Sequence, residues 1–426
     1  FIYNYMKVGI IGSGGREHAL CHALHRSKEI KEIYCFPGNA GTTKLAKNIK
    51  IDFNDFEKLK EFVINEKIDL ILVGPEKPLV DGIVDFFEKS KIKIFGPNKI
   101  ASQLEGSKIF TKKICEKYKI PTAKFGIFQS IEKANLFLNQ NTFPIVVKAD
   151  GLAAGKGVYI CENKIEAENS IKEIFGGKFG LAKNILIEEF LEGEEMSYFI
   201  VSDGKTIKNF QTAQDHKRVL EGDKGKNTGG MGAYSPSRLI NEDLEKKIMN
   251  KIILPTIKGL SDIGCKYKGF LYAGLMIVKN EPYLIEYNVR MGDPECQTIL
   301  PKLKSDLLEI VIACCSENLS NIEINWFDKK SLCIVLCSRG YPDEYKKNVL
   351  INNIDRIELK ENEYCYHAGT QKNENKIFST GGRVLNFVCL SNNFKDCREK
   401  IINSIKSLDW KNGFFRKDIG YKVINE

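Results

Sequence analysis

The chain has 426 residues, a length typical of about two to four domains. Its hydrophobic content of 43% and charged content of 28% are those of a soluble globular protein, and no apolar run approaches the ~20 residues of a membrane-spanning helix. The net charge of +9 is spread along the chain, with no basic stripe interleaved with aromatic residues, which argues against a nucleic-acid-binding protein.

The thirteen cysteines form no C-x-x-C pair and are scattered through apolar segments. Free buried thiols of this kind are typical of a reducing compartment, so we expect a cytoplasmic protein. The first five residues, FIYNY, lack the basic start and the apolar length of a signal peptide. We therefore expect the native chain to begin at Met6.

Residues 6–105 alternate between predicted strands and helices, which indicates a parallel sheet with its ligand at the carboxyl ends of the strands. The first glycine turn carries Gly12 and Gly14, but Glu17 stands where a dinucleotide fingerprint has its third glycine, so NAD binding is disfavoured. Backbone N–H groups at the helix start, together with Arg16, would still suit a phosphate. The alternative is that these glycines only form tight turns.

Three histidines, His18, His22 and His25, share one face of the helix predicted after this turn. No acid completes an H-E-x-x-H pattern, and Ala and Leu residues supply a core stripe beside them. We therefore interpret this face as polar or partly buried rather than as a zinc site.

The stretch KADGLAAGKGVYI has Gly151, Gly155 and Gly157 around Lys156. The spacing differs from that of a P-loop, and a glycine replaces the hydroxyl residue after the lysine. The flanking segments predict two strands, so the glycines lie at a hairpin tip with bare backbone N–H groups. A glycine-rich flap over a triphosphate fits this pattern, and a flexible surface hairpin is the alternative.

Two later stretches carry carboxylates. In NILIEEFLEGEEMSYFI, Glu188 and Glu189 end a predicted strand, and Glu194 and Glu195 follow a glycine turn. These carboxylates could hold an adenine amino group or a ribose hydroxyl, and solvated strand ends are the alternative.

The segment GFLYAGLMIVKNEPYLIEYNVRMGDPE predicts a hairpin of two apolar strands. Glu286, Asn288 and Arg290 are spaced by two, so they share one strand face. Oxygen ligands from Glu286 and Asn288 suit Mg²⁺, and Arg290 can reach phosphate oxygens.

Arginine is scarce beside lysine, so an arginine is expected where a planar guanidinium is needed. Four arginines lie in motif-like stretches: Arg16, Arg218, Arg290 and Arg383.

A glycine hairpin, a glutamate-rich turn and an E-x-N strand, in this order, resemble the ATP-grasp fold. The longer motifs resemble the glycinamide ribonucleotide synthetase family of that superfamily, from Met6 to the end of the chain. The motifs are GSGGREHAL, GPEKPLVDG, FGPNKIASQLEGSK, PIVVKADGLAAGKGV, IEEFLEGEE, QDHKR, NTGGMGAYSP, GFLYAGLMI, EYNVRMGDPE and FRKDIG. Met291 departs from the family, which usually has Phe there, and we expect it to pack.

The resemblance implies an α/β protein with an N-terminal parallel-sheet domain (6–105), an ATP-grasp domain (106–325) with a mobile lid (about 123–192), and a C-terminal mixed domain (326–426). We read no catalytic set in the C-terminal domain. The implied reaction joins glycine to 5-phosphoribosylamine with ATP, through glycyl phosphate, in purine biosynthesis. The implied cofactor is Mg²⁺, with Mn²⁺ as a substitute, and a monomer or weak homodimer is expected, with neither nucleic acid nor membrane as a partner.

The resemblance also implies a role for each motif residue. The expected ATP ligands are Lys108, Lys148, Gly155, Lys156, Gly157, Glu188, Glu189, Leu191 and Glu195. The expected metal ligands are Glu286 and Asn288. The expected catalytic residues are Arg290, Asp215 and Lys217. The expected ligands of glycine, the acyl phosphate and phosphoribosylamine are Gly14, Gly15, Arg16, Pro75, Glu76, Asn227, Thr228, Gly229, Gly230, Asp293 and Pro294.

Two alternatives remain open. Another ATP-grasp carboxylate–amine ligase would share the ATP ligands, and only the N-terminal glycine loops with QDHKR and NTGGMG argue against it. A non-enzymatic nucleotide-binding protein would not need Glu286, Asn288 and Arg290 on one strand face.

Overall fold

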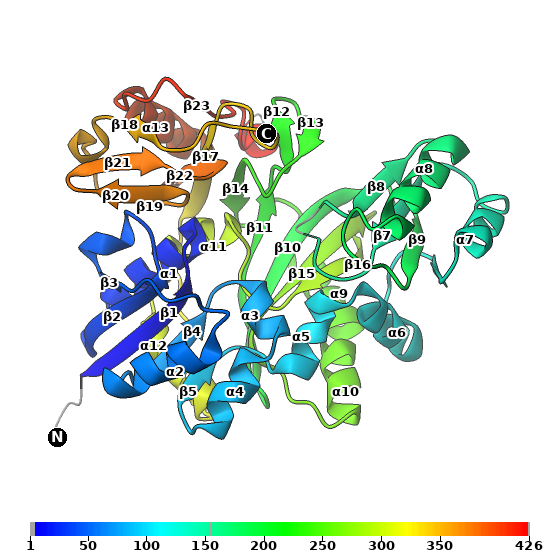
Figure 1. Ribbon diagram of the computed structural model, residues 1–426, viewed down its shortest axis with the longest axis horizontal. Coiled ribbons are helices and arrows are strands. Elements are labelled where there is room, and N and C mark those ends of the chain that lie inside the picture. Colours follow the sequence, from blue (N-terminus) through cyan, green and yellow to red (C-terminus); the bar gives the residue numbers. More distant parts are fainter. Residues whose placement is uncertain (1–4, 154–155, 425–426) are drawn as a thin grey trace.

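The computed structural model describes residues 5–153 and 156–424. Figure 1 shows an N-terminal lobe in blue, a C-terminal lobe in orange and red beside it, and a smaller lobe, with β7, β8 and β9, that projects from the opposite side of the central strands. Nowhere in the described ranges does a helix combine the length and the apolar character needed to cross a membrane.

The N-terminal lobe is built on a five-stranded sheet of order β3-β2-β1-β4-β5, and every neighbouring pair is parallel, which confirms the prediction. Its strands are β1 (Met6–Gly12), β2 (Ile30–Pro37), β3 (Lys47–Asn48), β4 (Leu70–Val73) and β5 (Lys93–Phe95). Its helices are α1 (Gly15–His25), α2 (Phe56–Asn65), α3 (Glu76–Val80), α4 (Ile83–Lys89) and α5 (Lys99–Gly106).

The small lobe is a four-stranded antiparallel sheet of order β6-β9-β7-β8 with its own apolar cluster. Its elements are β6 (Phe125–Phe128), α7 (Ile131–Leu138), β7 (Ile145–Ala149), β8 (Val158–Cys161), α8 (Lys164–Phe175) and β9 (Ile185–Glu189). The predicted hairpin is confirmed, because β7 pairs with β8. The helix before this lobe is α6 (Lys108–Tyr118), which Ser107 caps by accepting the Phe110 N–H.

The central sheet has nine strands, with β16-β15-β10-β11-β14-β17-β22-β19 in order and β23 beside β17. The strands are β10 (Glu194–Asp203), β11 (Ile207–Asp215), β14 (Gly232–Ser235), β15 (Lys268–Val278), β16 (Glu281–Asn288), β17 (Lys330–Ser338), β19 (Glu363–His367), β22 (Arg383–Ser391) and β23 (Gly413–Phe414). The predicted β15–β16 hairpin is confirmed. Strand β14 pairs with β17, so the same sheet contains strands from both sides of the sequence boundary expected near residue 326.

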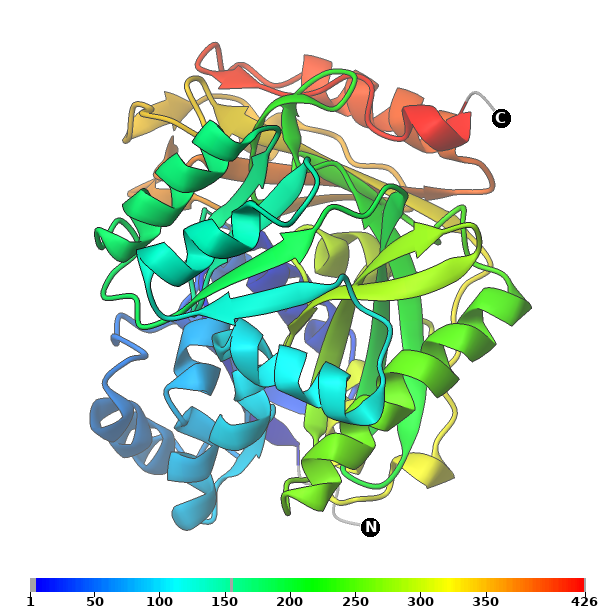
Figure 2. The ribbon, with the colours of Figure 1, turned by 90° about the vertical axis from the view of Figure 1, so that its right-hand side faces the viewer.

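Helices cover both sides of this sheet, and Figure 2 shows α6 and the run from α9 to α10 beside β15 and β16. The helices are α9 (Glu242–Ile248), which continues through a π-helical turn (Met249–Ile253) into α10 (Leu254–Asp262), with α11 (Glu295–Ile299), α12 (Leu307–Cys315), α13 (Phe394–Lys406) and α14 (Tyr421–Ile424). The remaining strands are β12 (Arg218–Leu220), β13 (Lys224–Asn227), β18 (Val349–Ile351), β20 (Thr370–Asn373) and β21 (Lys376–Ser379).

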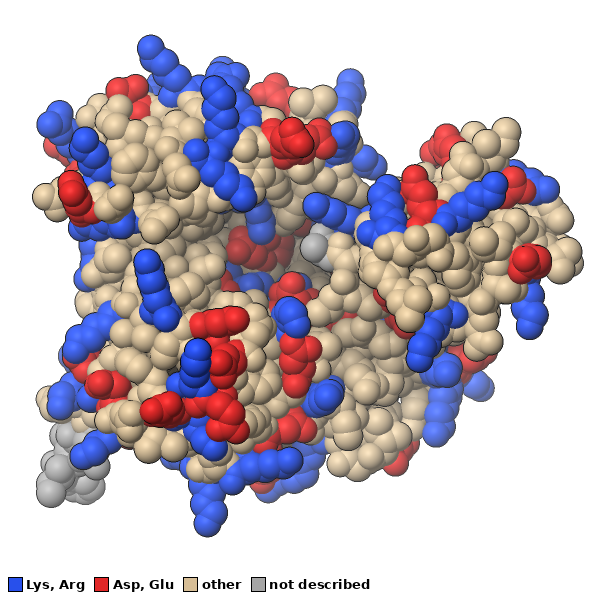
Figure 3. Space-filling view, viewed as in Figure 1, with Lys and Arg blue, Asp and Glu red and all other residues tan. Residues whose placement is uncertain are grey.

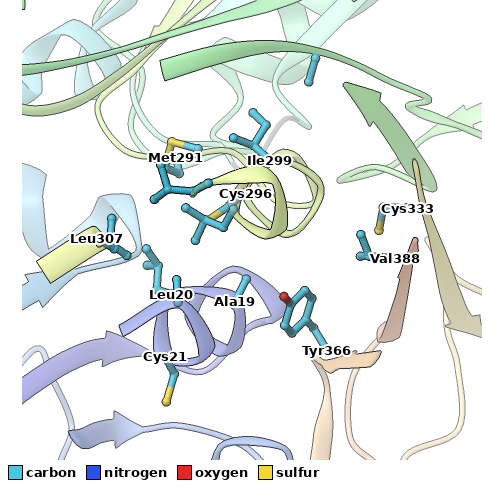
Figure 4. Close-up of a cluster of buried hydrophobic side chains, with 14 of the residues drawn as sticks. Ala19, Leu20, Cys21, Met291, Cys296, Ile299, Leu307, Cys333, Tyr366 and Val388 are labelled. Carbon is cyan, nitrogen blue, oxygen red and sulfur yellow. The ribbon is translucent and has the colours of Figure 1, made fainter. Parts of the chain in front are cut away.

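One apolar cluster joins the N-terminal lobe to the rest of the molecule, and Figure 4 shows Ala19 and Leu20 of α1 facing Cys296 and Met291. Met291 is 1% exposed, which confirms the expectation that it packs. Burying a side chain of this size contributes about 1.5–3 kcal/mol.

The histidine face of α1 meets the C-terminal lobe. The backbone N–H of His367 donates to His18 Nδ1 (2.8 Å), and Tyr366 Oη lies 3.2 Å from His22 Nδ1. His18 is buried, His22 is partly buried and His25 is exposed, so the prediction of a polar, partly buried face is confirmed. Burial lowers the pKa of His22 to about 4, so this contact is made with a neutral ring.

Candidate active site

A cavity of about 390 Å³ lies where the lobes meet, and Figure 3 shows a hollow at the centre of this face with acidic side chains in its depth. It brings together many of the residues that the sequence singled out. Those that line it are Arg16, Glu76, Lys108, Lys148, Gly157, Glu188, Asp215, Lys217, Thr228, Gly229, Glu286, Asn288, Arg290 and Asp293. Leu186 and Leu284 give one wall an apolar surface.

One half of the cavity, hereafter the lysine half, is formed by Lys108, Lys112 and Lys148 around Glu188. Glu188 lies 2.9 Å from Lys148 Nζ and 3.2 Å from Lys112 Nζ. Burial by itself would raise the pKa of Glu188, but the two ammonium groups outweigh it and lower that pKa. Lys108 Nζ donates to the carbonyl oxygens of Ala149 and Gly151, at 2.8 and 3.0 Å, so it holds the base of the glycine hairpin. Three cations with one carboxylate leave a net positive surface that suits a polyphosphate.

Glu286 and Asn288 lie on β16, whereas Arg290 comes two residues after the strand ends, so only the first two lie on the predicted strand face. All three line the cavity, and Glu286 interacts electrostatically with both Lys108 and Lys217. The Glu286 carboxylate makes no hydrogen bond or ion pair with any of the residues that the structure describes, and Asn288 Oδ1 accepts from Arg290 Nη2 at 3.3 Å. A free carboxylate and an amide oxygen facing a cavity suit Mg²⁺, which takes few protein ligands and completes its shell with phosphate and water.

Arg290 is held by two carboxylates. Its Nε lies 3.3 Å from Glu76, and its Nη2 donates to Glu105 at 2.6 Å. Glu105 also accepts the backbone N–H of Val289 at 3.0 Å. Burial raises the pKa of Glu105 to about 7 although Arg290 opposes the shift. Sequence reasoning missed Glu105, although it lies in the motif FGPNKIASQLEGSK.

The other half, hereafter the acid half, contains Asp215, Glu295 and Lys217. Burial, reinforced by the charge of Asp215, raises the pKa of Glu295 to about 8. Burial also raises the pKa of Asp215. The negative charge of Glu195, followed in size by that of Asp215, raises the pKa of Lys217. A Cβ at Gly292 would lie 1.6 Å from Glu295 Oε2, so glycine alone leaves room for this carboxylate. Sequence reasoning missed Glu295, the last residue of MGDPE.

Several predicted residues do not line this cavity. Glu189 accepts the backbone N–H of Lys124 at 2.9 Å, Glu195 pairs with Lys217 at 3.1 Å, and Lys156 is exposed. The others are Gly14, Gly15, Pro75, which precedes α3, Leu191, Asn227, Gly230, and Pro294, which precedes α11. Gly155 lies outside the described residues.

The start of α1 holds a carboxylate of the chain itself. Glu17 accepts the Gly14 N–H at 3.2 Å and pairs with Arg16 Nη2 at 3.0 Å. Arg16 Nη1 donates to the Met291 carbonyl at 3.3 Å. Glu17 thus stands where the sequence suggested a phosphate, and Gly15 packs against the C-terminal lobe, since a Cβ there would lie 2.2 Å from Asn386 Nδ2.

The C-terminal lobe contributes Arg383 to the cavity, which sequence reasoning did not place there. Its Nη1 donates to the carbonyl oxygens of Gly229 (2.9 Å) and Asp293 (2.8 Å). Arg383 and Asp293 also line a second cavity, of about 650 Å³, which Gly14 reaches.

A lysine-lined cavity beneath an antiparallel glycine-hairpin lobe, with oxygen ligands on a facing strand, defines an ATP-grasp enzyme. Sequence models of phosphoribosylglycinamide synthetase match residues 6–105 (N domain), 106–296 (ATP-grasp domain) and 331–422 (C domain). The chain belongs to this family.

Individual relatives agree with the family assignment. Phosphoribosylamine–glycine ligases of Caldanaerobacter subterraneus subsp. tengcongensis and Brucella melitensis are 45% and 43% identical, over 97% and 98% of this chain and 99% and 98% of theirs. A crystal structure of phosphoribosylamine–glycine ligase from Thermotoga maritima superposes with a TM-score of 0.86 and 32% identity, over 97% of this chain and all of that one. A biotin carboxylase from Campylobacter jejuni, 15% identical with a TM-score of 0.73 over 96% of this chain and 92% of its own, shares the fold alone.

Proposed function

We propose that this protein ligates glycine to 5-phosphoribosylamine, converting ATP to ADP and phosphate and forming glycinamide ribonucleotide through glycyl phosphate. The observation that carries the proposal is a single cavity with a cationic half for a triphosphate and an acidic half for an ammonium ion. The names of the relatives support the same reaction.

We assign the triphosphate to the lysine half, where Lys108, Lys148 and the hairpin of Gly157 face it. Lys156, which directly precedes Gly157, would belong to the same hairpin. Mg²⁺, bound by Glu286 and Asn288, would neutralise charge on the phosphates, and Mn²⁺ would fit the same oxygen ligands. The hairpin lobe (about 123–192) would exclude water, so that an acyl phosphate is not hydrolysed.

The acid half would hold glycine, with its ammonium group between Asp215 and Glu295 and its carboxylate toward Lys217 and Arg290. An oxygen of that carboxylate attacks the γ-phosphorus of ATP, and ADP leaves. The amine of phosphoribosylamine then attacks the carbonyl carbon, forms the C–N bond as it loses a proton, and expels phosphate. No protein nucleophile is required, so positioning and charge neutralisation supply the rate.

Glu76 and Glu105 fix the guanidinium of Arg290, which we assign to the transferring phosphoryl group. The remaining predicted ligands, including Thr228 and Gly229, would line the space between glycine and phosphoribosylamine. We further propose the domain boundaries expected from the sequence, 6–105, 106–325 and 326–426, and a cytoplasmic location, which thirteen free cysteines suit.

The test is ADP release with Mg-ATP while glycine or phosphoribosylamine is omitted in turn, with phosphoribosylamine generated in place because it is unstable. ADP release that requires both substrates supports the proposal. ADP release that ignores either substrate, or no release from a chain that binds ATP, contradicts it and leaves another ATP-grasp substrate pair or a binding protein.

A further inference from the structure

One buried cluster of charged side chains lies outside the reaction cavity and has no part in the steps described above. It joins the motif FRKDIG (415–420), near the end of the chain, to the β12–β13 hairpin and to His216 of the motif QDHKR. Figure 1 shows β12 and β13 beside the C-terminal segment, drawn in red. The hydrogen bond between Gly420 and His216 spans 204 positions of sequence, so the cluster connects two motifs that are distant along the chain.

Arg416 is the centre of this cluster. Its side chain is 1% exposed, so its charge must be paired. Nε and Nη2 donate to the two oxygens of Asp418, at 2.8 and 2.7 Å. Nη1 donates to Asp223 Oδ1 at 2.8 Å and to the Arg218 carbonyl oxygen at 3.0 Å, and Asp418 accepts the Gly222 N–H at 2.8 Å. The end of the chain is thus fixed to the hairpin at several points.

Asp223 links Arg416 to His216. Its Oδ1 lies 3.0 Å from His216 Nδ1, and its Oδ2 accepts from Tyr421 Oη at 2.7 Å. Burial favours the neutral acid, but hydrogen bonds, of which that of His216 is the largest, outweigh burial and hold the pKa of Asp223 well below its ordinary value. Asp223 is therefore an ionised acceptor for three donors.

The ring of His216 is fixed at both nitrogens. Nε2 accepts the backbone N–H of Gly420 at 3.1 Å, so the ring proton is on Nδ1, where Asp223 accepts it. The backbone is held as well, because the His216 N–H donates to the Gly232 carbonyl oxygen at 2.9 Å and its carbonyl oxygen accepts the Met231 N–H at 2.7 Å. This side chain cannot turn without breaking hydrogen bonds to the C-terminal segment.

His216 stands between two residues of the acid half. Asp215 and Lys217 line the reaction cavity, whereas His216 does not. Side chains alternate along β11, and the hydrogen bond of His216 to β14 continues the strand pairing past Asp215. Lys217 is fixed from the other side, since its carbonyl oxygen accepts the N–H and the hydroxyl of Thr228, both at 2.7 Å. A ring directed away from the cavity therefore directs both neighbours toward it.

The rest of the cluster can affect the reaction only indirectly. Asp223, Arg416 and Asp418 line neither of the two cavities. Their connection to the acid half runs through His216, and a buried ion-pair network of this kind is costly unless every member is satisfied. The contacts above satisfy it, which is what a rigid support for neighbouring side chains requires.

We propose that the FRKDIG segment is a positioning element for glycine binding. Arg416 and Gly420 act on His216, the former through Asp223, and His216 holds the side chains on either side of it toward the ammonium and carboxylate groups of glycine. The proposal rests on the proposed function, since it concerns one of that reaction's substrates. The C-terminal lobe, in which the sequence shows no catalytic set, then contributes to the affinity for glycine.

The first test replaces Asp223 with Asn. Asp223→Asn keeps the shape of the side chain, and Asn tolerates the left-handed backbone at this position (φ 56°). It removes the charge that three donors share, so KM for glycine should rise about tenfold, while KM for ATP stays within twofold of wild type. Asp396→Asn is the matched control, because this carboxylate of the same lobe also accepts from a hydroxyl, that of Ser391, and pairs with Lys400 at 3.0 Å. Its KM values should equal those of wild type.

Milder variants keep the proposal testable if Asp223→Asn does not fold. Tyr421→Phe removes one hydrogen bond to Asp223 and leaves Arg416 in place, so KM for glycine should rise about threefold. Tyr345→Phe, at another partly buried tyrosine of the same lobe, should leave it unchanged. His216→Leu should raise KM for glycine at least as much as Asp223→Asn. His216→Asn, whose amide offers a donor near the position of Nδ1, should recover part of that loss.

Two further measurements separate positioning from general stability. Saturating glycine should raise the melting temperature of Asp223→Asn less than that of wild type, whereas Mg-ATP should raise both equally. In a Lys217→Met background, Asp223→Asn should change KM for glycine much less than it does alone, because the two substitutions act on the same contact.

Two results would overturn the proposal. The melting temperature of the cluster variants could fall with KM for glycine unchanged, or KM for glycine and KM for ATP could rise equally, and either would show that the cluster only supports the fold. Both are measured on an enzyme that makes product. Failure of the proposed function is distinct, since ADP release by the wild type would then not depend on glycine at all.

Discussion

The two halves of the reaction cavity use buried charge in opposite ways. In the lysine half, Glu188 is ionised because Lys112 and Lys148 contact it directly. In the acid half, burial raises the pKa of both Glu295 and Asp215, and the charge of Asp215 adds to the rise at Glu295, although Lys217 opposes both shifts. The lysine half thus has more cations than carboxylates, whereas the acid half has two carboxylates, Asp215 and Glu295, for the one cation of Lys217.

This difference indicates which ligand each half is built to receive. A surplus of ammonium groups is satisfied by phosphate oxygens, and a pair of poorly ionised carboxylates is satisfied by an incoming ammonium ion. Variants in one half should therefore change the affinity for one substrate and leave the other unchanged. Glu286, between the halves, should be the exception.

The largest expected effect is that of Glu286→Gln. It keeps the shape of the side chain but removes the carboxylate that we assign to Mg²⁺, so turnover should fall by about a thousandfold and should recover in part at high Mg²⁺. Steady-state ADP release across a Mg²⁺ titration measures this. Glu281→Gln, on the same strand and paired with Lys247 and Lys251 outside the cavity, is the matched control. Equal activity of the two variants would show that Glu286 holds no metal.

The next effect is that of Glu295→Gln, which tests the acid half alone. KM for glycine should rise about a hundredfold, because a buried charged contact to the ammonium group is lost, and KM for ATP should stay within twofold. Initial rates with each substrate varied in turn separate the two constants. A parallel rise of KM for glycine and KM for ATP would mean that the two halves of the cavity do not bind their substrates independently.

Lys148→Met tests the lysine half. Glu188 keeps Lys112 as a partner at 3.2 Å, so the lobe should fold, and KM for ATP should rise about tenfold while KM for glycine is unchanged. Lys113→Met, an exposed lysine on α6 with no partner among the described residues, is the control. A changed KM for glycine together with an unchanged KM for ATP would contradict the assignment of Lys148 to the triphosphate.

Much of the lysine half and of the adjoining segment from Glu286 to Arg290 could be predicted from local patterns in the sequence. The β7–β8 and β15–β16 hairpins were predicted from apolar runs around glycine or polar turns, and the spacing of Glu286, Asn288 and Arg290 was enough to place all three in one cavity. Period-two alternation is a property of the chain itself, so no tertiary information is needed.

The residues that sequence reasoning missed are brought in by contacts between distant segments. Glu105, in the last turn of α5, contacts Arg290 across 185 positions of sequence, and Arg383 contacts Gly229 across 154. The role of Glu17 could not be predicted either. A fingerprint that lacks its third glycine does not indicate that the carboxylate at that position accepts the Gly14 N–H at the start of the helix. Such contacts depend on how the lobes pack, which local periodicity does not determine.

The smallest expected effect is on stability, and it tests why the acid half is poorly ionised. Glu295 has a pKa of about 8 in the folded chain against an ordinary value of 4.5, so the folded state binds more protons than the unfolded state between these pH values. The stabilisation that accompanies protonation is complete below pH 4.5 and is lost as pH rises through 8. Glu295→Gln cannot ionise, so relative to wild type it should gain on the order of 1–2 kcal/mol between pH 5 and pH 9 without substrates.

Thermal unfolding of both proteins across this pH range measures the gain. Saturating glycine should raise the melting temperature of wild type more at pH 9 than at pH 6, because its ammonium group supplies the cation that the ionised acids lack, and it should do so much less in Glu295→Gln. A glycine effect that is equal in the two proteins would place the ammonium group elsewhere. A pH profile unchanged by the substitution would mean that Glu295 is already ionised in the ligand-free cavity, and the contrast between the two halves would then rest on Asp215 alone.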